Sequence, residues 1–290
     1  NMLTQRAKRE PKKVVFANAD SFKVLKAAQI TCEEGIAKPI LLGEEKLIRQ
    51  IAEENGLDIS NMPIIDPFVP TPRFEEYAEV LFEKRQRKGI TLYDARKLLM
   101  NRSYYGCMMV EAGEADAFVS GITRKYAHAM KPALQVIGAE PGVGRVSGMY
   151  IMLTKQGQYF FSDTSVTPNP TVDDIVDITI STANAVKRLG IKPVVSLLSY
   201  SNFGSVEGEV PRKMAQATAI LKERYPGLLV DGEMQANFAL NNEMLKENFP
   251  FSELVGHEVN TFIFPDLASA NMSYKMLQSF GAAEAIGPVL

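Results

Sequence analysis

Polar side chains gather in five short loops, and each loop directly follows a run of residues typical of a buried strand. In open α/β sheets ligands bind at the carboxyl ends of the strands, so these loops are the first candidates for chemistry. Together they predict a shared ligand-binding cleft, with ordinary surface loops as the alternative. The loops are SGITRKY after Phe118-Val119, SDTSVTPNP after Phe161, SYSNFGS after residues 196–198, DGEMQ after Leu229-Val230, and PDLASAN after residues 262–264.

The groups in these loops favour an anionic ligand. Hydroxyls and backbone N–H groups at helix starts suit anions, because the N–H groups of the first turn lack partners and the helix dipole is positive there. Arg124, Lys125, Lys131 and the basic cluster KRQRKG (84–89) would add positive charge. The pattern predicts a phosphorylated ligand, although helix capping explains a residue such as Thr171 equally well.

Several common motifs are missing from the sequence. It has no GxxxxGK[ST], and GAEPGVG lacks the GxGxxG spacing, so neither a P-loop nor a Rossmann dinucleotide site is predicted. Ser120-Gly121 does not form GxSxG, which argues against a hydrolase nucleophile. His128 and His257 lie in different regions, and no set of His, Cys and carboxylate residues has metal-binding spacing, so no metal is predicted.

The elements that must position these loops alternate between short strand-like runs and longer helix-like runs. This alternation predicts an α/β fold with mostly parallel sheets. The glycine-rich segment GAEPGVGRVSG (138–148) marks the domain boundary. The predicted division is a connector from an upstream region at 1–12, a first α/β domain at 13–141 and a second α/β domain at 142–290.

The expected strands and helices follow from local patterns. Residues 149–153 and 158–161, separated by Thr-Lys-Gln-Gly, read as an antiparallel hairpin. The other strands are expected at 14–17, 39–43, 64–65, 116–120, 193–198, 228–230 and 261–264. The helices are expected at 21–34, 44–55, 73–88, 92–100, 103–113, from the SGITRKY loop to about 138, and at 171–189, 208–225, 233–247 and 267–280.

Composition bounds the remaining possibilities. A chain of 290 residues with 46% apolar content can form one large domain or two smaller ones. A net charge of −2 predicts no nucleic-acid binding by bulk attraction, and no apolar run is long enough for a membrane span. Cys32 and Cys107 are far apart and belong to no CxxC, which predicts a reduced cytoplasmic protein with cysteines as packing residues. The chain begins with Asn and shows no signal peptide, which suggests a piece of a longer protein.

Long segments of the chain resemble the phosphate acetyltransferase family, in the same order and from about Pro11 to the last residue. The closest variant resembles the carboxyl-terminal domain of large bacterial NADP-dependent malic enzymes, through SNFGS, DGEMQANFAL and RAKREPKKVVFANAD. The segments that carry the family resemblance are YYGCMMVEAGEADAFVSG (104–121), KPALQVIG (131–138), SVTPNPT (165–171), LLSYSNFGS (197–205), VDGEMQ (230–235), FIFPDLASANMSYK (262–275) and AEAIGPVL (283–290).

The resemblance implies a fold, ligands and a chemistry. The implied fold has two α/β subdomains with a cleft between them, as in phosphotransacetylases and in isocitrate and isopropylmalate dehydrogenases. The family transfers acetyl groups between coenzyme A and phosphate without a metal; a carboxylate acts as the base on the thiol, and arginines hold the phosphate or acetyl oxygen. Acetyl-CoA, CoA and phosphate are therefore the expected ligands, and NADP is expected only in an upstream malic-enzyme domain absent from this chain.

The family pattern, carried onto this sequence, gives the expected site residues. Arg85 is placed by its spacing to Lys131, and Arg87 is an alternative for the same role. Arg85 and Lys131 are the expected catalytic residues, and together with Arg124 they are expected to contact phosphate or acetyl oxygens. Ser120, Gly121 and Thr123 are expected as N–H and hydroxyl donors. The remaining expected residues are Thr167, Asn169 and Thr171 between the domains, and Tyr200, Ser201 and Ser205 on the second domain.

Two departures from the family pattern bear on turnover. Lys131 stands where the family has an arginine before PALQ, and lysine lacks the planar fork that holds phosphate at two points. The family's catalytic base and its Ser-Arg pair follow GPVL, and this chain ends at Leu290. The same segment would return to complete the first domain.

Three functions follow from this resemblance. The leading hypothesis is a regulatory and assembly domain of a malic enzyme that binds acetyl-CoA and forms homo-oligomers, with the upstream domain as its partner. The second is an active phosphate acetyltransferase. The third is a purely structural dimerisation domain. Its sequence support is an apolar helix face, for which core packing is the favoured explanation; the face comprises Leu267, Met272, Met276, Leu277 and Phe280.

Overall fold

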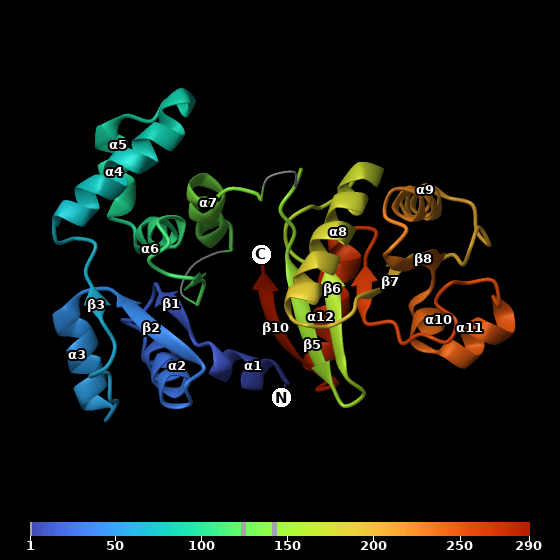
Figure 1. Ribbon diagram of the computed structural model, residues 1–290, viewed down its shortest axis with the longest axis horizontal. Helices are drawn as coiled ribbons and strands as arrows, with labels where there is room; N and C mark the ends of the chain where they lie inside the picture. The colour runs from blue at the N-terminus through green and yellow to red at the C-terminus, as the bar shows by residue number, and fades with distance from the viewer. Residues whose placement is uncertain (1, 123–125, 141–143) are drawn as a thin grey trace. The chain divides into compact units, whose positions relative to one another are not determined.

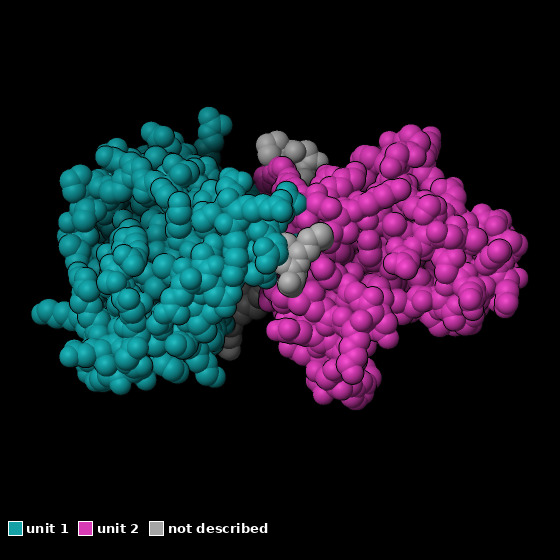
Figure 2. Space-filling view, turned by 60° about the horizontal axis from the view of Figure 1, so that its bottom comes forward, with its two compact units in different colours: residues 1–138 teal, residues 139–290 magenta. Residues whose placement is uncertain are grey.

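The chain divides into two compact units, each with its own hydrophobic core. The computed structural model describes residues 2–122, 126–140 and 144–290 (Figure 1). Unit 1 comprises residues 1–138 and unit 2 comprises residues 139–290, shown in teal and magenta in Figure 2. Every cluster of buried hydrophobic side chains in the described part of the chain draws its members from one unit only. Each unit is therefore described by itself.

Unit 1 is built on a parallel four-stranded sheet with the strand order β3-β2-β1-β4. Val15 in β1 pairs with Ile40 in β2 on one side and with Phe118 in β4 on the other. The chain adds β2 and β3 outward from β1 and then returns to add β4 on the opposite side of β1. The strands are β1 (Lys12–Phe16), β2 (Ala37–Leu42), β3 (Ile64–Ile65) and β4 (Ala117–Val119).

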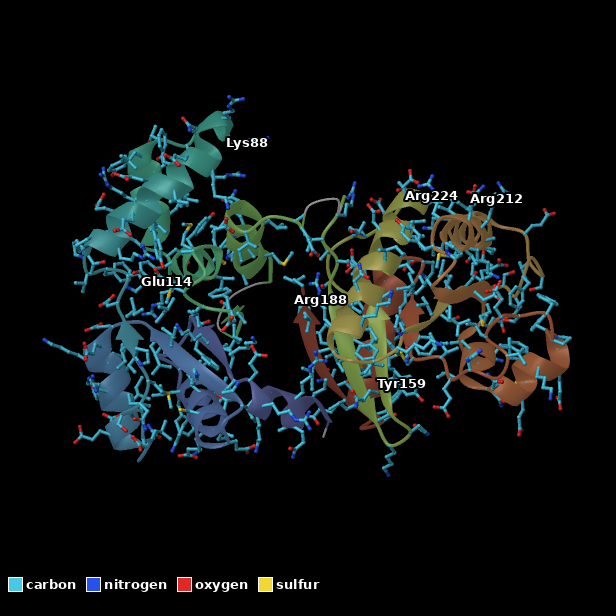
Figure 3. The ribbon with its side chains drawn as sticks, in the orientation of Figure 1. Lys88, Glu114, Tyr159, Arg188, Arg212 and Arg224 are labelled. Carbon is cyan, nitrogen blue, oxygen red and sulfur yellow. The ribbon has the colours of Figure 1, made fainter. Side chains whose placement is uncertain are left out.

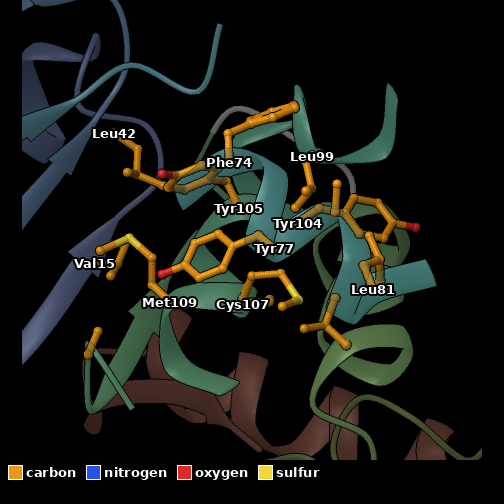
Figure 4. Close-up of a cluster of buried hydrophobic side chains, with 14 of the residues drawn as sticks. Val15, Leu42, Phe74, Tyr77, Leu81, Leu99, Tyr104, Tyr105, Cys107 and Met109 are labelled. Carbon is orange, nitrogen blue, oxygen red and sulfur yellow. The ribbon is translucent and has the colours of Figure 1, made fainter. Parts of the chain in front are cut away.

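Helices cover both faces of the first sheet. Side chains of α2 and α3 pack with Phe16 and Leu41 on one face. Side chains of α4, α5, α6 and α7 pack with Val15 and Leu42 on the other (Figure 4). Lys88 lies at the tip of the arm formed by α4, η1 and α5 (Figure 3). The helices are α1 (Met2–Arg9), α2 (Phe22–Glu33), α3 (Glu45–Glu54), α4 (Pro72–Arg85), the short 3-10 helix η1 (Gln86–Lys88), α5 (Leu92–Leu99), α6 (Arg102–Glu111) and α7 (Tyr126–Val136).

Unit 2 contains a mixed six-stranded sheet with the order β10-β5-β6-β9-β7-β8. β5 and β6 form the antiparallel hairpin that the sequence predicts, and β10 pairs antiparallel with β5. β6, β9, β7 and β8 run parallel, so their carboxyl ends meet at one edge (Figure 1). The strands are β5 (Met149–Thr154), β6 (Gln158–Ser162), β7 (Val194–Leu198), β8 (Leu229–Met234), β9 (Thr261–Ile263) and β10 (Ala283–Val289).

Helices also cover both faces of the second sheet. Side chains of α8 and α9 pack with Val195 and Leu197 from β7 on one face. Side chains of α10, α11 and α12 pack with Leu198 and Phe262 on the other. The helices are α8 (Val172–Arg188), α9 (Glu209–Arg224), α10 (Ala236–Leu240), α11 (Asn242–Asn248) and α12 (Leu267–Ser279). The expected α/β class with mostly parallel sheets is therefore confirmed.

Three local features differ from the elements expected from the sequence. Residues 2–9, expected within a connector, form helix α1. The helix expected at 233–247 is two helices, because β8 extends to Met234 and Asn241 ends α10 and caps α11. The last residues, for which no strand was expected, form β10 on the edge of the second sheet.

The apolar face of α12 follows the expected core packing only in part, since Leu277 packs against the core and other members do not. Ala270 and Tyr274 are buried, but Met272, Met276 and Phe280 have 59%, 55% and 74% of their surface exposed. The three exposed residues are four apart, so they form a stripe along the outer side of the helix. Core packing therefore does not explain this stripe.

Two simpler expectations can be compared with the structure. Cys107 is fully buried and Cys32 half-buried, and burial raises the pKa of the Cys107 thiol to about 12, so this cysteine is a packing residue. Across the described ranges, none of the helices combines the length and the apolar character that a membrane crossing requires.

Candidate functional site

The loops after β1 and β4 meet where the strand order of unit 1 reverses. The chain leaves β1 for α2 on one face of the sheet and leaves β4 for α7 on the other. Ser120 Oγ lies 3.5 Å from Asn18 Oδ1, and the backbone N–H of Ala17 donates to the carbonyl of Val119 at 3.1 Å. Two loops that diverge from neighbouring parallel strands leave a crevice at their carboxyl ends, where ligands bind in doubly wound folds.

An ion pair follows β1, and a glycine with a positive φ follows β4. Asp20, just after β1, pairs with Arg102 at the start of α6, with 2.7 Å between Oδ1 and NH1. Gly121 has a φ of +119°, a conformation that residues with a Cβ rarely adopt. Of the predicted residues here, Ser120 and Gly121 directly follow the carboxyl end of β4, whereas Thr123 and Arg124 lie outside the described residues.

Two of the predicted residues, Arg85 and Lys131, lie on helices next to a hydrogen bond that joins α6 to α7. Tyr104 on α6 donates its hydroxyl to Gln135 Oε1 on α7 at 2.6 Å. Lys131 lies one turn before Gln135, on the same face of α7. Burial raises the pKa of Tyr104, and the charge of the nearby Arg85 guanidinium acts in the opposite direction. Arg85, at the end of α4, thus lies near Tyr104.

Arg85 also carries an unpaired donor. Its Nε is buried and has no hydrogen-bond partner in the described part of the chain. Burying a donor without a partner is unfavourable, which is why nearly all such groups in proteins are paired. Lys131 is exposed on α7. A guanidinium N–H without a partner and an exposed ammonium are both groups that can bind an anion.

In unit 2, a single carboxylate organises the polar loop after β6. Asp163 is 3% exposed and accepts four backbone N–H bonds. Its Oδ1 accepts from Gly148, Ser165 and Val166 at 3.0, 3.0 and 3.1 Å, and its Oδ2 accepts from Thr167 at 2.6 Å. The loop therefore wraps around Asp163, and its shape depends on that side chain.

The predicted residues of this loop have different environments. Thr167 is buried, while Asn169 is exposed. Thr171 caps α8: its Oγ1 accepts from the Asp174 N–H at 3.2 Å, and the Asp174 carboxylate accepts from the Thr171 N–H at 2.9 Å. Thr171 thus has the capping role that the sequence left open as an alternative to ligand binding.

The loop after β7 is held by the end of β8. Ser201 is fully buried and donates to Glu233 Oε1 at 2.9 Å, and the Gly204 N–H donates to the same atom at 2.7 Å. Tyr200 is 53% exposed, and Ser205 is also exposed. Of the three residues predicted in this loop, Tyr200 and Ser205 are open to solvent, whereas the Ser201 hydroxyl is used inside the protein.

The loops after β6 and β9 are joined at the same edge of the second sheet. The Leu267 N–H donates to the Pro168 carbonyl at 3.1 Å, and Asn271 Nδ2 donates to the Thr164 carbonyl at 3.2 Å. Lys213 on α9 donates to the Pro265 carbonyl at 2.9 Å. The polar loops that the sequence marked after β6 and β9 therefore form one connected rim.

Sequence reasoning missed the buried acids that shape these loops. Asp163 and Glu233 both lie inside the family motifs, but a carboxylate repels an anionic ligand, so only hydroxyls and cations were predicted to bind it. A signal was available, because an acid directly after a buried strand has several backbone N–H groups within reach. Asn18 was missed as well, although it follows β1 as Ser120 follows β4.

Comparisons with known proteins agree over the whole chain. The family model described as "Phosphate acetyl/butaryl transferase" matches residues 1–290. The chain is 39% identical, over 294 aligned residues, to the phosphate acetyltransferase of Thermoanaerobacterium thermosaccharolyticum, covering 99% of this chain and 88% of the relative. The EutD phosphotransacetylase of Staphylococcus aureus superposes with a TM-score of 0.91 at 31% identity, covering 100% of this chain and 88% of that one. A phosphotransacetylase of Streptococcus pyogenes gives 0.90 at 34%, covering 99% and 87%.

These comparisons overturn the leading hypothesis of the sequence analysis. The relatives at 35–39% identity are named phosphate acetyltransferase and show no malic-enzyme context. The prediction of an acetyl-CoA-sensing regulatory domain of a malic enzyme is therefore wrong.

Proposed function

The chain belongs to the phosphate acetyl/butaryl transferase family, and from this premise we propose that it is an active phosphate acetyltransferase. It would convert acetyl-CoA and phosphate to acetyl phosphate and CoA. The observation that carries the proposal is the family match along all 290 residues, together with relatives named for this activity. Acetyl-CoA, CoA and phosphate are the proposed ligands.

The proposed chemistry asks two things of the protein. A phosphate oxygen attacks the thioester carbonyl carbon, the C–S bond breaks, and the CoA sulfur leaves and takes up a proton. Positive groups must hold the phosphate and stabilise the charge that develops on the carbonyl oxygen. Arg85, Arg124 and Lys131 are proposed for these contacts, with Ser120, Gly121 and Thr123 as hydroxyl and N–H donors.

The unpaired Nε of Arg85 supports this assignment. A phosphate or acetyl oxygen would give this donor the partner that it lacks within the described residues, once binding reorients the side chain. Lys131, one turn before the Gln135 that accepts the Tyr104 hydroxyl, would add a second positive charge. In unit 2, Thr167, Asn169, Thr171, Tyr200, Ser201 and Ser205 remain proposed ligand-side residues, and Ser201 and Thr171 would act through the shape of their loops.

The first test measures acetyl-CoA formation from acetyl phosphate and CoA by thioester absorbance. We expect turnover in the wild type, and we expect Lys131→Ala to lower kcat/KM about 10- to 100-fold, the effect of losing roughly 1.5–3 kcal/mol of hydrogen bonding to a charged group. Lys46→Ala, which removes an exposed lysine from α3, is the control and should leave kcat/KM unchanged. A wild type without turnover, or equal effects of the two variants, contradicts the proposal.

Self-association remains a prediction. The exposed stripe of Met272, Met276 and Phe280 on α12 is the surface that favours it, because contiguous exposed apolar side chains mark contact surfaces. A cytoplasmic location also stays a prediction from the two lone cysteines.

A further inference from the structure

Glu233 holds the loop after β7 at three points. Its carbonyl oxygen accepts the N–H of Phe203 at 2.8 Å. Its Oε1 accepts the Ser201 hydroxyl at 2.9 Å and the Gly204 N–H at 2.7 Å. The side chain lies almost entirely inside the protein, with 2% of the residue exposed. One buried residue at the end of β8 thus binds three of four consecutive residues of a neighbouring loop.

The loop conformation that Glu233 holds is unfavourable for a free chain. Phe203 has a φ of +49°, in the left-handed region that residues with a Cβ avoid, and Gly204 follows with a φ of +84°. A bulky residue persists in this region only where its surroundings compensate for the strain. The hydrogen bonds from residues 201, 203 and 204 to Glu233 supply that compensation.

The bond to Ser201 also orients the rest of the loop. Because Ser201 gives its proton to Glu233, its oxygen is left to accept, and it accepts the Val206 N–H at 3.1 Å. Ser205 Oγ lies 3.4 Å from Ser201 Oγ and accepts the Asn202 N–H at 2.9 Å. The exposed Ser205 hydroxyl is thus connected, through Ser201, to a carboxylate that is out of reach of solvent.

We propose that Glu233 is a positioning residue that fixes the 200–206 loop in its ligand-binding conformation. The inference rests on the proposed function, because Tyr200 and Ser205 are ligand-side residues only if that function holds. Glu233 is too deeply buried to touch acyl-CoA itself, so it would act through the exposed groups of the loop. The expected consequence is weaker CoA binding when the carboxylate is removed.

Asp231 provides a matched control two residues earlier on the same strand. Like Glu233, it is buried, with 4% of the residue exposed, and its carboxylate accepts several hydrogen bonds. Its carboxylate accepts the Gly232 N–H at 3.0 Å within β8. Its other partners are Lys222 Nζ at 2.8 Å, Ser252 Oγ at 2.7 Å and the Glu253 N–H at 3.0 Å. These bonds connect β8 to α9 and to residues 252–253, not to the 200–206 loop. Loss of Asp231 therefore perturbs the same strand without releasing the loop.

The test combines amide hydrogen exchange with kinetics in the full chain. We expect Glu233→Ala to raise exchange in residues 199–206 about 10- to 100-fold, because two donors lose a charged acceptor. Glu233→Gln should fall between wild type and Glu233→Ala, since its amide oxygen can still accept both bonds. Asp231→Asn should raise exchange near residues 252–253 and leave the 199–206 peptide unchanged.

The kinetic readout separates positioning from general destabilisation. Glu233→Ala should raise the KM for CoA about tenfold or more with a smaller change in kcat, whereas Asp231→Asn should change neither. If amide exchange in residues 199–206 is unchanged in Glu233→Ala, the proposal that Glu233 anchors this loop is wrong. Faster exchange with an unchanged KM overturns the role in ligand binding. If Glu233→Ala does not fold, Ser201→Ala removes one of the same bonds and carries the same test.

Failure of the proposed function gives a different pattern. A wild type that neither transfers acetyl groups nor binds CoA in a calorimetric titration overturns the phosphate acetyltransferase proposal and, with it, the ligand-binding part of the Glu233 role. Hydrogen exchange needs no substrate, so the anchoring of the loop by Glu233 is decided in every case.

Discussion

At the scale of single residues, the loops of the second unit are held by buried carboxylates that accept hydrogen bonds from backbone N–H groups. Asp163 accepts four such bonds, and Glu233 fixes a loop that contains a strained phenylalanine. Hydrogen bonds to a charged acceptor are shorter and stronger than those to a neutral one. An acid in such a position therefore shapes a loop even when it contacts no ligand.

Asp163→Asn should destabilise the protein strongly. The amide keeps an oxygen for some of the donors but presents an NH2 group to others, so at least one buried N–H loses its partner. We expect the free energy of unfolding to fall by roughly 2–4 kcal/mol in urea denaturation. Asp173→Asn, at an exposed acid in the first turn of α8, should change it by about 0.5 kcal/mol or less. Similar losses in the two variants would contradict the role of Asp163.

The sequence predicts a site residue only where the type of the residue and its position after a strand are enough to suggest its role. Ser120 and Gly121 were predicted at a strand end, and they directly follow β4. The contact of Ser120 with Asn18 was not predicted, because it depends on β1 and β4 being neighbours. Strand order is a property of the folded sheet and cannot be read from local spacing.

At the scale of elements, the start of α8 is stabilised by a reciprocal cap. Thr171 and Asp174 exchange hydrogen bonds, and Arg145 Nε lies 2.7 Å from Asp174 Oδ1. Burial alone would raise the pKa of Asp174, but the bonds from Thr171 and the charge of Arg145 outweigh it and lower that pKa below 3.8. The ionised form of Asp174 is therefore the form that stabilises the helix.

This lowered pKa predicts a stability effect that depends on pH. The contribution of Asp174 is present above the unfolded-state pKa near 3.8 and is lost as pH falls through the lower folded-state pKa. Asp174→Asn should therefore be less stable than wild type at pH 7, and the difference should shrink as the pH is lowered below about 4. Urea denaturation at pH 7, 5 and 3 measures it. A difference that grows toward low pH would contradict this account.

The alternation of strand and helix patterns predicted most of the elements, and the exceptions have physical reasons. β10 contains a Gly-Pro pair, has mostly exposed side chains and pairs with β5 more than 100 residues earlier, so no local pattern marks it. α1 is polar and basic, which reads as a connector. The single helix expected at 233–247 is interrupted at Asn241, which caps α11. The helical spacing of apolar residues continues across this position in the sequence, so the interruption was not predicted.

At the scale of the whole molecule, each unit has the parts of an independent domain. The clusters around β7, α8 and α9 and around β5, β9 and α12 use residues of unit 2 only. Residues 139–290 produced alone should therefore unfold cooperatively, with helix and sheet signals in circular dichroism. Residues 156–290 lack β5, which pairs with both β6 and β10, and should not fold. A disordered 139–290 fragment would contradict the prediction.

The ion pairs of Lys222 with Asp231 and Glu253 should affect how fast this lysine reacts with the proposed product. Acetyl phosphate, the proposed product, acylates amines, and only an unprotonated amine attacks an acyl carbon. Burial alone would lower the pKa of Lys222, but its bonds to Asp231 and Glu253, at 2.8 and 3.1 Å, outweigh burial and raise that pKa. Mass spectrometry after incubation with acetyl phosphate should find Lys222 modified more slowly than the exposed Lys187. The ion pair between Lys222 and Asp231 would then have a second effect besides holding β8: it would slow the acetylation of Lys222 by acetyl phosphate.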